Sequence, residues 1–455
     1  MHKVVIVGAG PAGVAAAELL VTNGIRPTLI DEAATAGGQI YRRPAPHINL
    51  DMRRLLGRDN VNYDGFHARA DNLLPRVDYR PRTTAWALFG DCVWTVRDDL
   101  IEQWPYHALI LATGATDRTI PVPGWTLPGV FTLGGAQVLL KGQGALIGRR
   151  VVFAGSSPLL YLAAKQYLAA GATVAAILDT TLFGAKVAAA WTLLSAPTTL
   201  ARGLATMARV RSSGVPIHHG VRLEAFDGER GISAVRYLDR AGHQKRVECD
   251  AVAFGFGLKP ETQLADLAGI PFRYDKTFRQ WLPAADGDGR AGARTYLAGD
   301  GFTIGGAQAA NISGMLAAAA LLEDVGTRMH NIDRSALRRQ LARLRSFQRG
   351  LARGFAWPTE RFASMDDNLA VCRCEDVNVG DIRRTVLAAL GPTDINRVKA
   401  LTRVGMGRCQ GRFCGLAAAE IVAAAADRPL ETAGRLRSQA PVKPLPPTAR
   451  ELKRP

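Results

Sequence analysis

Two parts of the chain share one pattern of hydrophobic and polar positions. Each begins with a short run of β-branched and other apolar residues, at 3–7 and at 151–154, and continues through a turn into an alanine- and leucine-rich stretch. A continuous apolar run of this length is typical of a strand that is buried on both faces. Strands that alternate with helices predict a parallel sheet covered by helices. The pattern therefore predicts an α/β fold with an internal duplication.

Residues 333–355 form a third pattern, in which leucines recur at the spacing of one helix face and arginines occupy the other. The leucines are Leu337, Leu341, Leu344 and Leu351, and the arginines are Arg338, Arg339, Arg343, Arg345, Arg349 and Arg353. This spacing predicts an amphipathic helix. Its arginine face is either solvated, with the helix packed on a neighbouring domain, or a docking surface for an acidic partner. Residues 182–200 are moderately apolar and predict a surface helix.

The composition narrows the class of protein. A chain of 455 residues, 47% of them hydrophobic, is long enough for about three domains. The formal net charge of +17 would suit nucleic acid, an acidic protein or a membrane surface. No basic–aromatic motif accompanies the charge, so we expect no binding of nucleic acid. The sequence shows neither a secretion signal nor a long uncharged apolar run. We expect a cytoplasmic protein without a transmembrane segment, at most peripheral to the inner membrane face.

The first turn carries a dinucleotide-binding signature of three glycines between a strand and a helix, with an acid after the next strand. The first glycine permits the tight bend, the second lets the backbone approach a pyrophosphate, and the third lets helix and strand pack closely. The helix N-terminus would stabilise the pyrophosphate charge, and the acid would accept hydrogen bonds from a ribose. The alternative is an empty α/β turn. The candidate residues of this unit are Gly8, Gly10, Ala12, Gly13, Asp31 and Glu32.

Two later segments favour FAD over NAD. Residues 109–114 read Leu-Ile-Leu-Ala-Thr-Gly, and residues 296–301 read Tyr-Leu-Ala-Gly-Asp-Gly before a glycine- and alanine-rich helix start. Both segments, and the loop at 37–42, resemble those of the glutathione-reductase-like flavoproteins with two dinucleotide-binding domains. In that group the acid matching Asp300 binds the ribityl chain of FAD, although a simple helix cap is the alternative for Asp300. The resemblance implies further FAD-binding residues: Gly38, Gln39, Arg42, Ala112, Thr113, Gly114, Gly299 and Asp300.

The second unit lacks the glycine signature. Gly155 is present, but Ser157 stands at the position of the second glycine and Leu160 at that of the third. A side chain at the second position crowds a pyrophosphate, and a leucine at the third pushes the helix off the strand. We expect this domain to keep the fold without its cofactor. If a nucleotide did bind, Asp179 at the end of the next strand would favour NAD over NADP.

Four cysteines near the C-terminus form a second candidate site. Cys372 and Cys374 are separated from Cys409 and Cys414 by a segment that predicts two short helices. Clustered cysteines in a reducing compartment are more often metal ligands than disulfides. Zinc usually takes pairs with a wider spacing, whereas the single residue between the first two cysteines suits two ligands of one iron in a [2Fe–2S] cluster. Zinc and an empty remnant are the alternatives. The spacing resembles the bacterioferritin-associated-ferredoxin-like [2Fe–2S] module, and the glycines at 405–407 would let backbone approach the sulfurs.

The combination resembles one group of proteins over nearly the whole chain. A flavoprotein with two dinucleotide-binding domains and a C-terminal Cys-x-Cys…Cys-x₄-Cys module is similar to the flavoprotein A (alpha) subunits of heteromeric amino-acid dehydrogenases: opine oxidase, D-hydroxyproline dehydrogenase and hydrogen cyanide synthase. The resemblance implies a hetero-oligomer with an amine-oxidising beta subunit that holds its own FAD and with a small iron–sulfur gamma subunit. It allows an FMN at the interface between subunits. No motif in this sequence builds an amino-acid pocket, so we expect the chain to relay electrons.

These patterns predict the domain limits and leave two other functions open. We expect a split FAD-binding domain at 1–125 and 275–330, a second dinucleotide domain at 126–274, a basic helical linker at 331–365, a small, mainly helical BFD-like [2Fe–2S] domain at 366–428 and a tail at 429–455. The first alternative function is a self-sufficient NADH-dependent flavin and iron–sulfur reductase. The second is a scaffold subunit whose FAD is redox-silent. Which amino acid is oxidised and which residues are catalytic stay unknown from the sequence.

Overall fold

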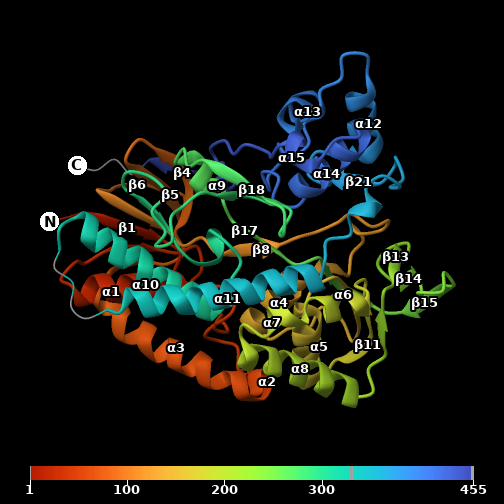
Figure 1. The fold of residues 1–455 in the computed structure, drawn as a ribbon, viewed down its shortest axis with the longest axis horizontal. Helices are drawn as coiled ribbons and strands as arrows, with labels where there is room; N and C mark the ends of the chain where they lie inside the picture. Colours follow the sequence, from red (N-terminus) through yellow and green to blue (C-terminus); the bar gives the residue numbers. More distant parts are fainter. Residues whose placement is uncertain (1, 328, 330–331, 452–455) are drawn as a thin grey trace.

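The computed structural model describes residues 2–327, 329 and 332–451. The outer limits predicted at 1, 330, 331 and 455 lie outside these residues, and the other domain limits stay predictions. The N-terminal half of the fold is a parallel sheet of apolar strands, covered by helices that include α1 (Pro11–Thr22), α3 (Asn60–Leu73) and α10 (Ala307–Asp324) (Figure 1). The order of its strands is β20 (Thr295–Leu297), β7 (Ala108–Leu111), β1 (Val4–Val7), β2 (Thr28–Ile30) and β3 (Asp78–Arg80).

A second five-stranded sheet confirms the internal duplication. The turn after its strand β10 leads into α5 (Leu159–Ala169), as the turn after β1 leads into α1. Buried β-branched and aromatic side chains line these strands, which fits the continuous apolar runs of the sequence. Helix α4 (Leu133–Gln143) packs on the same sheet. The order of the strands, all parallel, is β12 (Ile217–His219), β11 (Thr173–Asp179), β10 (Arg150–Gly155), β16 (Ala251–Gly255) and β9 (Val130–Thr132).

Smaller sheets surround these two units. A ribbon of β8 (Ala115–Asp117) and β17 (Leu258–Pro260) connects them. Strands β4 (Thr84–Phe89), β5 (Cys92–Arg97) and β6 (Leu100–Pro105) form an antiparallel sheet, which the tail extends through β23 (Arg450–Glu451). The tail therefore wraps over the first domain. The remaining strands are β13 (Arg222–Asp227), β14 (Ala234–Leu238) and β15 (Gln244–Glu248) in one meander, and β18 (Phe272–Asp275) and β19 (Gln280–Pro283) in a hairpin.

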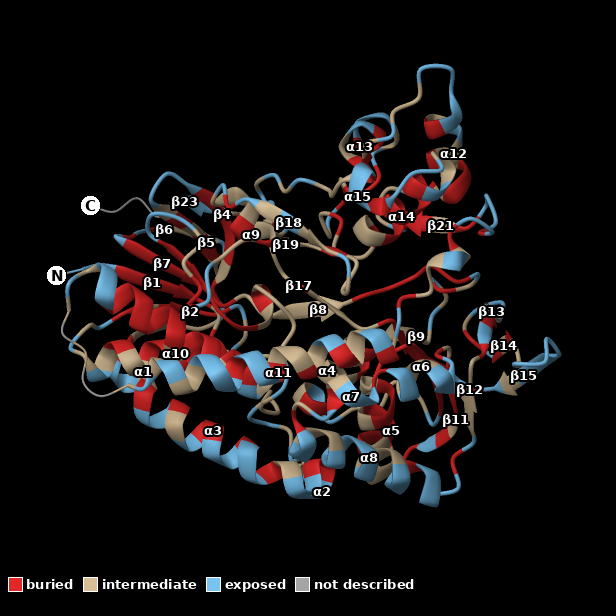
Figure 2. Cartoon of the chain, in the orientation of Figure 1, coloured by how far each residue is buried: buried red, intermediate tan, exposed pale blue. Residues whose placement is uncertain are grey.

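Residues 182–200 do not form the single surface helix that their composition suggests. The segment contains α6 (Phe183–Ala188), α7 (Ala190–Leu193) and the start of α8 (Pro197–Ser212). Pro197 has no N–H to continue a preceding helix and is instead the first residue of a new one. The three short helices lie on the outside of the second unit, and much of their surface is exposed (Figure 2).

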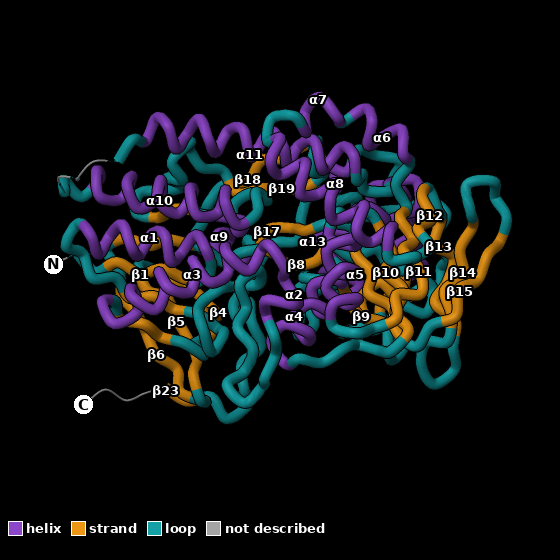
Figure 3. Tube along the Cα trace, turned by 90° about the horizontal axis from the view of Figure 1, so that it is seen from below, coloured by secondary structure: helices purple, strands orange, loops and turns teal. Residues whose placement is uncertain are grey.

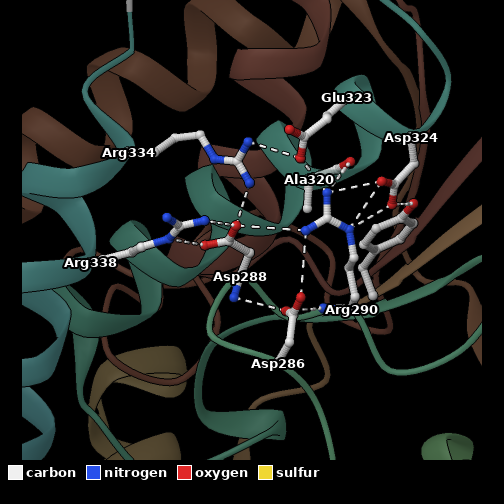
Figure 4. A network of polar contacts seen from close by, with 9 residues as sticks. Asp286, Asp288, Arg290, Ala320, Glu323, Asp324, Arg334 and Arg338 are labelled. Carbon is white, nitrogen blue, oxygen red and sulfur yellow. Dashed lines mark hydrogen bonds and ion pairs between the residues drawn. The ribbon is translucent and has the colours of Figure 1, made fainter.

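The predicted amphipathic helix is α11 (Arg334–Gly354), and some of its arginines pair with acids elsewhere in the chain. Arg334 and Arg338 both pair with Asp288, which is almost fully buried, in a network that also holds Arg290 (Figure 4). Arg349 pairs with Asp275 at 2.7 Å. The helix thus packs on α10 and the first domain, along one side of the molecule (Figure 3). Three arginines of the face are exposed without an ion pair to any described residue: Arg339, Arg343 and Arg353.

The C-terminal module is small and mainly helical, and it stands apart from the two sheets in Figure 1. Two short helices, α12 and α13, lie between the cysteine pairs, as predicted. Asn378 and Asp381 form a capping box at the start of α12, and Asp394 caps α13, so both helices begin at favourable residues. The elements are β21 (Ala370–Cys372), β22 (Val377–Asn378), α12 (Val379–Leu387), α13 (Ile395–Thr402), α14 (Gly415–Ala425) and α15 (Leu430–Ala433).

Candidate functional site

The first candidate site lies at the carboxyl edge of the first sheet. The sequence-predicted residues follow directly after four neighbouring strands: Gly8 after β1, Asp31 after β2, Ala112 after β7 and Gly299 shortly after β20. Parallel strands place their carboxyl ends at one edge, where α/β sheets bind ligands. The structure brings these loops together, because Gly8 N–H donates to the Ile30 carbonyl at 2.7 Å and a Cβ on Gly299 would lie 2.7 Å from the Ala12 Cβ.

The three glycines of the first turn have the roles that the signature predicts. Gly8 has φ +109°, and a Cβ there would lie 2.2 Å from the Ala112 carbonyl oxygen. A Cβ on Gly13 would lie 1.7 Å from the Gly8 carbonyl oxygen, so only glycine lets helix and strand meet. At Gly10 a Cβ would approach only the Gly38 Cα, at 3.7 Å. The space beside Gly10, in front of the uncapped N-terminus of α1, fits a pyrophosphate.

The two acids after β2 point in different directions. Asp31 is buried and accepts hydrogen bonds from the N–H groups of Ala9 and Ala33. Burial raises the pKa of Asp31 to about 6, although these two bonds oppose the shift. Glu32 instead pairs with Lys443 of the tail at 2.9 Å. Asp31 therefore lies against the glycine turn, whereas Glu32 lies at the tail.

Asp300 acts in part as a helix cap, which was the alternative role considered for this residue. Its Oδ1 accepts hydrogen bonds from the N–H groups of Gly305 (2.8 Å) and Gly306 (3.0 Å), just before α10. Burial raises the pKa of Asp300. Oδ2 has no hydrogen bond to a described residue and could accept one from a ligand. Thr113 also lies here, because a Cβ on Gly301 would come within 2.5 Å of its Oγ1.

Two basic side chains near these loops were not found from the sequence. Arg345 of α11 lies beside Asp300 at a small cavity, its Nε is buried without a partner, and burial lowers its pKa. Lys141 of α4 is 3% exposed and lies beside the predicted Gln39 and Arg42, with its Nζ 3.4 Å from the Ile40 carbonyl. Arg345 belonged to a predicted linker and Lys141 to an ordinary helix. Only the fold, which carries α11 to Asp300 and α4 to the loop at 37–42, reveals them.

The corresponding corner of the second unit is filled by the protein itself. Ser157 and Leu160 are buried, and α5 begins at Leu159, four residues after Gly155, whereas α1 begins three residues after Gly8. Asp179 is fully buried and accepts hydrogen bonds from Tyr161 (2.6 Å), Thr181 and Lys186. Burial opposes ionisation, but hydrogen bonds from His219 and Lys186 together with the charge of Lys186 lower its pKa to about 2.

The four predicted cysteine ligands lie together in the C-terminal module. The thiol of Cys414 is in hydrogen-bonding contact with Cys372 and Cys409, and Cys374 is in contact with Cys409. Cys372 and Cys414 are buried, whereas Cys374 and Cys409 are partly exposed. Among the described residues, no group of three or more His, Cys, Asp or Glu side chains is arranged to hold one metal ion. The contacts instead pair each cysteine of one segment with a cysteine of the other.

The surroundings favour a thiolate at Cys372 and Cys409, whereas burial raises the pKa of Cys374 and hydrogen bonds to Cys372 and Cys409 raise that of Cys414. Hydrogen bonds from Cys414 and from backbone N–H groups lower the pKa of Cys372 to about 6 and that of Cys409 to about 5. The N–H of Gly405 is one of these donors to Cys372. A Cβ on Gly407 would lie 2.3 Å from the Cys374 Cβ, so the glycines do allow the close backbone approach that the sequence suggested. Thiolates with many N–H donors are what an iron–sulfur cluster requires.

Hydrogen bonds and an ion pair fix the module to the rest of the chain. The Trp125 indole N–H donates to the Ala370 carbonyl at 2.8 Å, and Glu420 of α14 binds both Arg279 and the Trp357 indole N–H. A cavity of about 110 Å³ remains between the cysteine loop, the β18–β19 hairpin and the start of the tail. The cysteine site therefore adjoins the β8–β17 ribbon, which itself follows directly from the Thr113–Gly114 loop.

Comparison with known proteins identifies both sites. Residues 2–300 match the pyridine nucleotide-disulphide oxidoreductase family, and residues 370–424 match the BFD-like [2Fe-2S] binding domain. The A subunit of opine oxidase from Agrobacterium tumefaciens (strain Ach5) is 37% identical, over 99% of this chain and 93% of that protein. The HcnB subunit of hydrogen cyanide synthase from Pseudomonas protegens is 31% identical, over 97% of this chain and 96% of that protein. L-Proline dehydrogenase from P. horikoshii has the same fold, with a TM-score of 0.71, 20% identity and coverage of 98% and 78% of the two chains.

The chain belongs to the pyridine nucleotide-disulphide oxidoreductase family, and it is related over nearly its whole length to the A subunits of opine oxidases. It is an oxidoreductase subunit of a hetero-oligomeric enzyme, and its cofactors are FAD and a [2Fe–2S] cluster, as the sequence predicted. The two pairs of cysteines fit the cluster, and the glycine turn fits the FAD pyrophosphate. Each helix of the described chain is too short or too polar to cross a bilayer.

Proposed function

We propose that the chain is the electron-transfer subunit of a heteromeric dehydrogenase that oxidises an amino acid of the opine, proline or glycine type. A partner flavoprotein subunit would oxidise the amine, and this chain would pass the electrons from FAD to its cluster and on to an acceptor. The observation that carries the proposal is the placement of two redox sites side by side in one chain whose nicotinamide corner is filled by its own side chains. The names of the relatives support the substrate class.

The proposed FAD site uses the four loops at the edge of the first sheet. Gly10, with Ala12 and Gly13 at the start of α1, would hold the pyrophosphate through backbone N–H groups, and Asp31 would bind the ribose. The free oxygen of Asp300 would bind the ribityl chain. The cations of Arg42, Lys141 and Arg345 would offset the phosphate charge. FAD supplies the ability to accept two electrons and release them singly. The protein binds FAD and holds the four loops of the site in place.

A partner belongs to the proposal because no motif in the sequence builds an amino-acid pocket. The helices α6 to α8 offer a docking surface: their exposed apolar side chains are Leu182, Phe183, Val187, Trp191, Leu194 and Leu204. No aspartate or glutamate occurs between Asp179 and Glu224. Arg339, Arg343 and Arg353 of the neighbouring α11 are exposed as well. We propose that this face binds the amine-oxidising beta subunit. The beta subunit would present an apolar patch with an acidic rim to it. We also propose that the complex contains a small iron–sulfur gamma subunit and binds an FMN at the interface between its subunits.

The filled corner of the second unit gives the first test. We predict that NADH and NADPH do not reduce the FAD of the purified holo-chain at useful rates, because Asp179 is already saturated by Tyr161, Thr181 and Lys186. The measurement is anaerobic stopped-flow absorbance of the flavin. Bleaching by micromolar NADH within seconds would support the self-sufficient reductase instead. Dithionite, which needs no binding site, is the control that the flavin is reducible.

A further inference from the structure

A buried ion pair joins the flavin loop to the cluster loop. Glu261 lies just after β17, where its N–H donates to the Gly114 carbonyl at 2.9 Å. The Thr113 hydroxyl donates in turn to the Glu261 carbonyl at 2.6 Å. Thr113 and Gly114 belong to the loop after β7, at the edge of the FAD site. The backbone of Glu261 is therefore fixed to the flavin loop by two hydrogen bonds.

The side chain of Glu261 reaches the cysteines through Arg412. The Arg412 Nε donates to one carboxylate oxygen at 2.7 Å and its Nη2 to the other at 3.2 Å, and the side chains are only 12% and 11% exposed. Arg412 lies between Cys409 and Cys414 in the sequence, and its Nη1 also donates to the carbonyls of Cys409 (3.3 Å) and Val442 (2.6 Å). One unbroken series of contacts thus runs from Thr113 through Glu261 and Arg412 to a cluster ligand.

Apolar packing around the ion pair is incomplete, because a cavity lies beside it. The cavity of about 110 Å³ is lined by Glu261 and Arg412 themselves, together with Gly405, Gly411 and Gly415 of the cysteine segments. Those glycines carry no side chains of their own, and Leu436 of the tail packs against them, within 3.1 Å of where a Cβ of each would lie. A buried ion pair contributes little net stability compared with apolar side chains of the same size, but it demands one geometry. Such a pair is suited to hold a distance and an orientation.

We propose that Glu261 and Arg412 are positioning residues that hold the cluster loop against the flavin loop and thereby set the rate of electron transfer between FAD and the cluster. This inference rests on the proposed function. In each transfer one electron leaves the reduced flavin and converts one ferric ion of the oxidised cluster to the ferrous state. Neither residue accepts the electron. Both act through the position of the groups that do, and small displacements can slow a reaction about 100-fold.

The test uses the holo-chain with both cofactors. Laser-flash photoreduction delivers electrons to FAD, and the absorbance and electron paramagnetic resonance of the cluster report their arrival. We expect Glu261→Gln and Arg412→Met each to slow the transfer at least about 10-fold, while flavin, iron and acid-labile sulfide per chain stay unchanged. The double variant should be no slower than the slower single variant, because both changes break one contact.

Asp266→Asn is the matched control. It breaks the ion pair of Arg435 with Asp266, which is 2.7 Å long, similarly buried and also ties the C-terminal region to the first domain. That pair touches neither the flavin loop nor a cysteine, so the transfer rate should change less than about twofold. If Arg412→Met loses its cluster, Glu261→Gln decides the question, since it changes no residue of the cluster loop.

The reduction potential of the cluster separates position from charge. Glu261→Gln removes a negative charge and Arg412→Met a positive one, so the two potentials should move in opposite directions while both rates fall. Rates that rise in one variant and fall in the other would overturn the positioning role, as would unchanged rates in both. If the unmodified chain itself transferred no electron from flavin to cluster, the proposed function would fail before the ion pair was tested.

Discussion

Two aspartates at matching places in the duplicated fold show how single residues separate the two units. Asp31 directly follows β2 and accepts hydrogen bonds from two backbone N–H groups of the described chain, and its pKa is raised to about 6 by burial. Asp179 ends β11 and is surrounded by donors from Tyr161, Thr181 and Lys186, so its pKa is lowered to about 2. The same position thus serves a cofactor site in one unit, as we propose, and the packing of the domain in the other.

The Asp179 network predicts a pH-dependent effect on stability. Its pKa lies below the ordinary 3.8, so the stabilisation is complete above about pH 4 and is lost as the pH falls toward 2. Replacing Asp179 with Asn should lower the free energy of unfolding by about 2 kcal/mol at neutral pH. Urea titrations from pH 6 down to pH 2.5 should show this difference shrinking, with FAD still bound at neutral pH. A difference that is constant across this range would contradict the assignment.

Cys409 allows the two cofactors to be separated. Cys409→Ser should remove the cluster and leave FAD bound, because the flavin loops lie on the other side of the β8–β17 ribbon. Iron, acid-labile sulfide and flavin per chain are the measurements. Cys249→Ser is the control, since Cys249 is buried beside Asp250 and Arg150 of the second unit and its loss should leave both cofactors. Equal loss of flavin and iron in Cys409→Ser would contradict independent sites.

At the scale of elements, the sequence predicted those parts whose signal is local. The strand, turn and helix of each unit were predictable, since their apolar runs and turn residues are read directly, and α11 begins and ends within one residue of its predicted limits. The arginines of α11 were not predictable in their roles. Arg338 and Arg349 pair with acids far away in the sequence, at Asp288 and Asp275. Residues 182–200 were predicted wrongly, because Pro197 begins a helix instead of lying within one.

The exposed face of α6 to α8 predicts where the partner subunit binds. Trp191 is 85% exposed, and an exposed tryptophan among apolar neighbours is typical of a residue that dominates a protein interface. Trp191→Glu should weaken association with the co-expressed beta subunit by at least about 10-fold without changing cofactor content. Sizing profiles and affinity measurements report the association.

A matched control exists on the C-terminal module. Leu390 is 100% exposed and belongs to the loop between α12 and α13, which lies away from α6 to α8 in Figure 1. Leu390→Glu should leave the association unchanged. Equal affinities of the Trp191 and Leu390 variants for the partner would show that the beta subunit binds elsewhere.

For the whole molecule, the sequence predicted which sites exist and could not predict how they are joined. The glycine turn and the four cysteines identified FAD and a [2Fe–2S] cluster because each is a compact motif. The bridge through Thr113, Glu261 and Arg412 joins residues that lie about 150 positions apart or more, and no local pattern marks it. Arg345 and Lys141 were missed for the same reason, since only the packing of α11 and α4 brings them to the FAD site.

The central claim is that electrons from a partner subunit pass through the FAD and the cluster of this chain. The most direct measurement mixes the purified complex anaerobically with the amino acid or opine that its partner subunit oxidises. Stopped-flow absorbance then follows the flavins, and rapid-freeze electron paramagnetic resonance follows the cluster. We predict that the cluster is reduced within one turnover, and that Cys409→Ser abolishes this signal and the passage of electrons to an external dye. If the dye were reduced at full rate while the cluster stayed oxidised, the chain would be a scaffold and the account would be wrong.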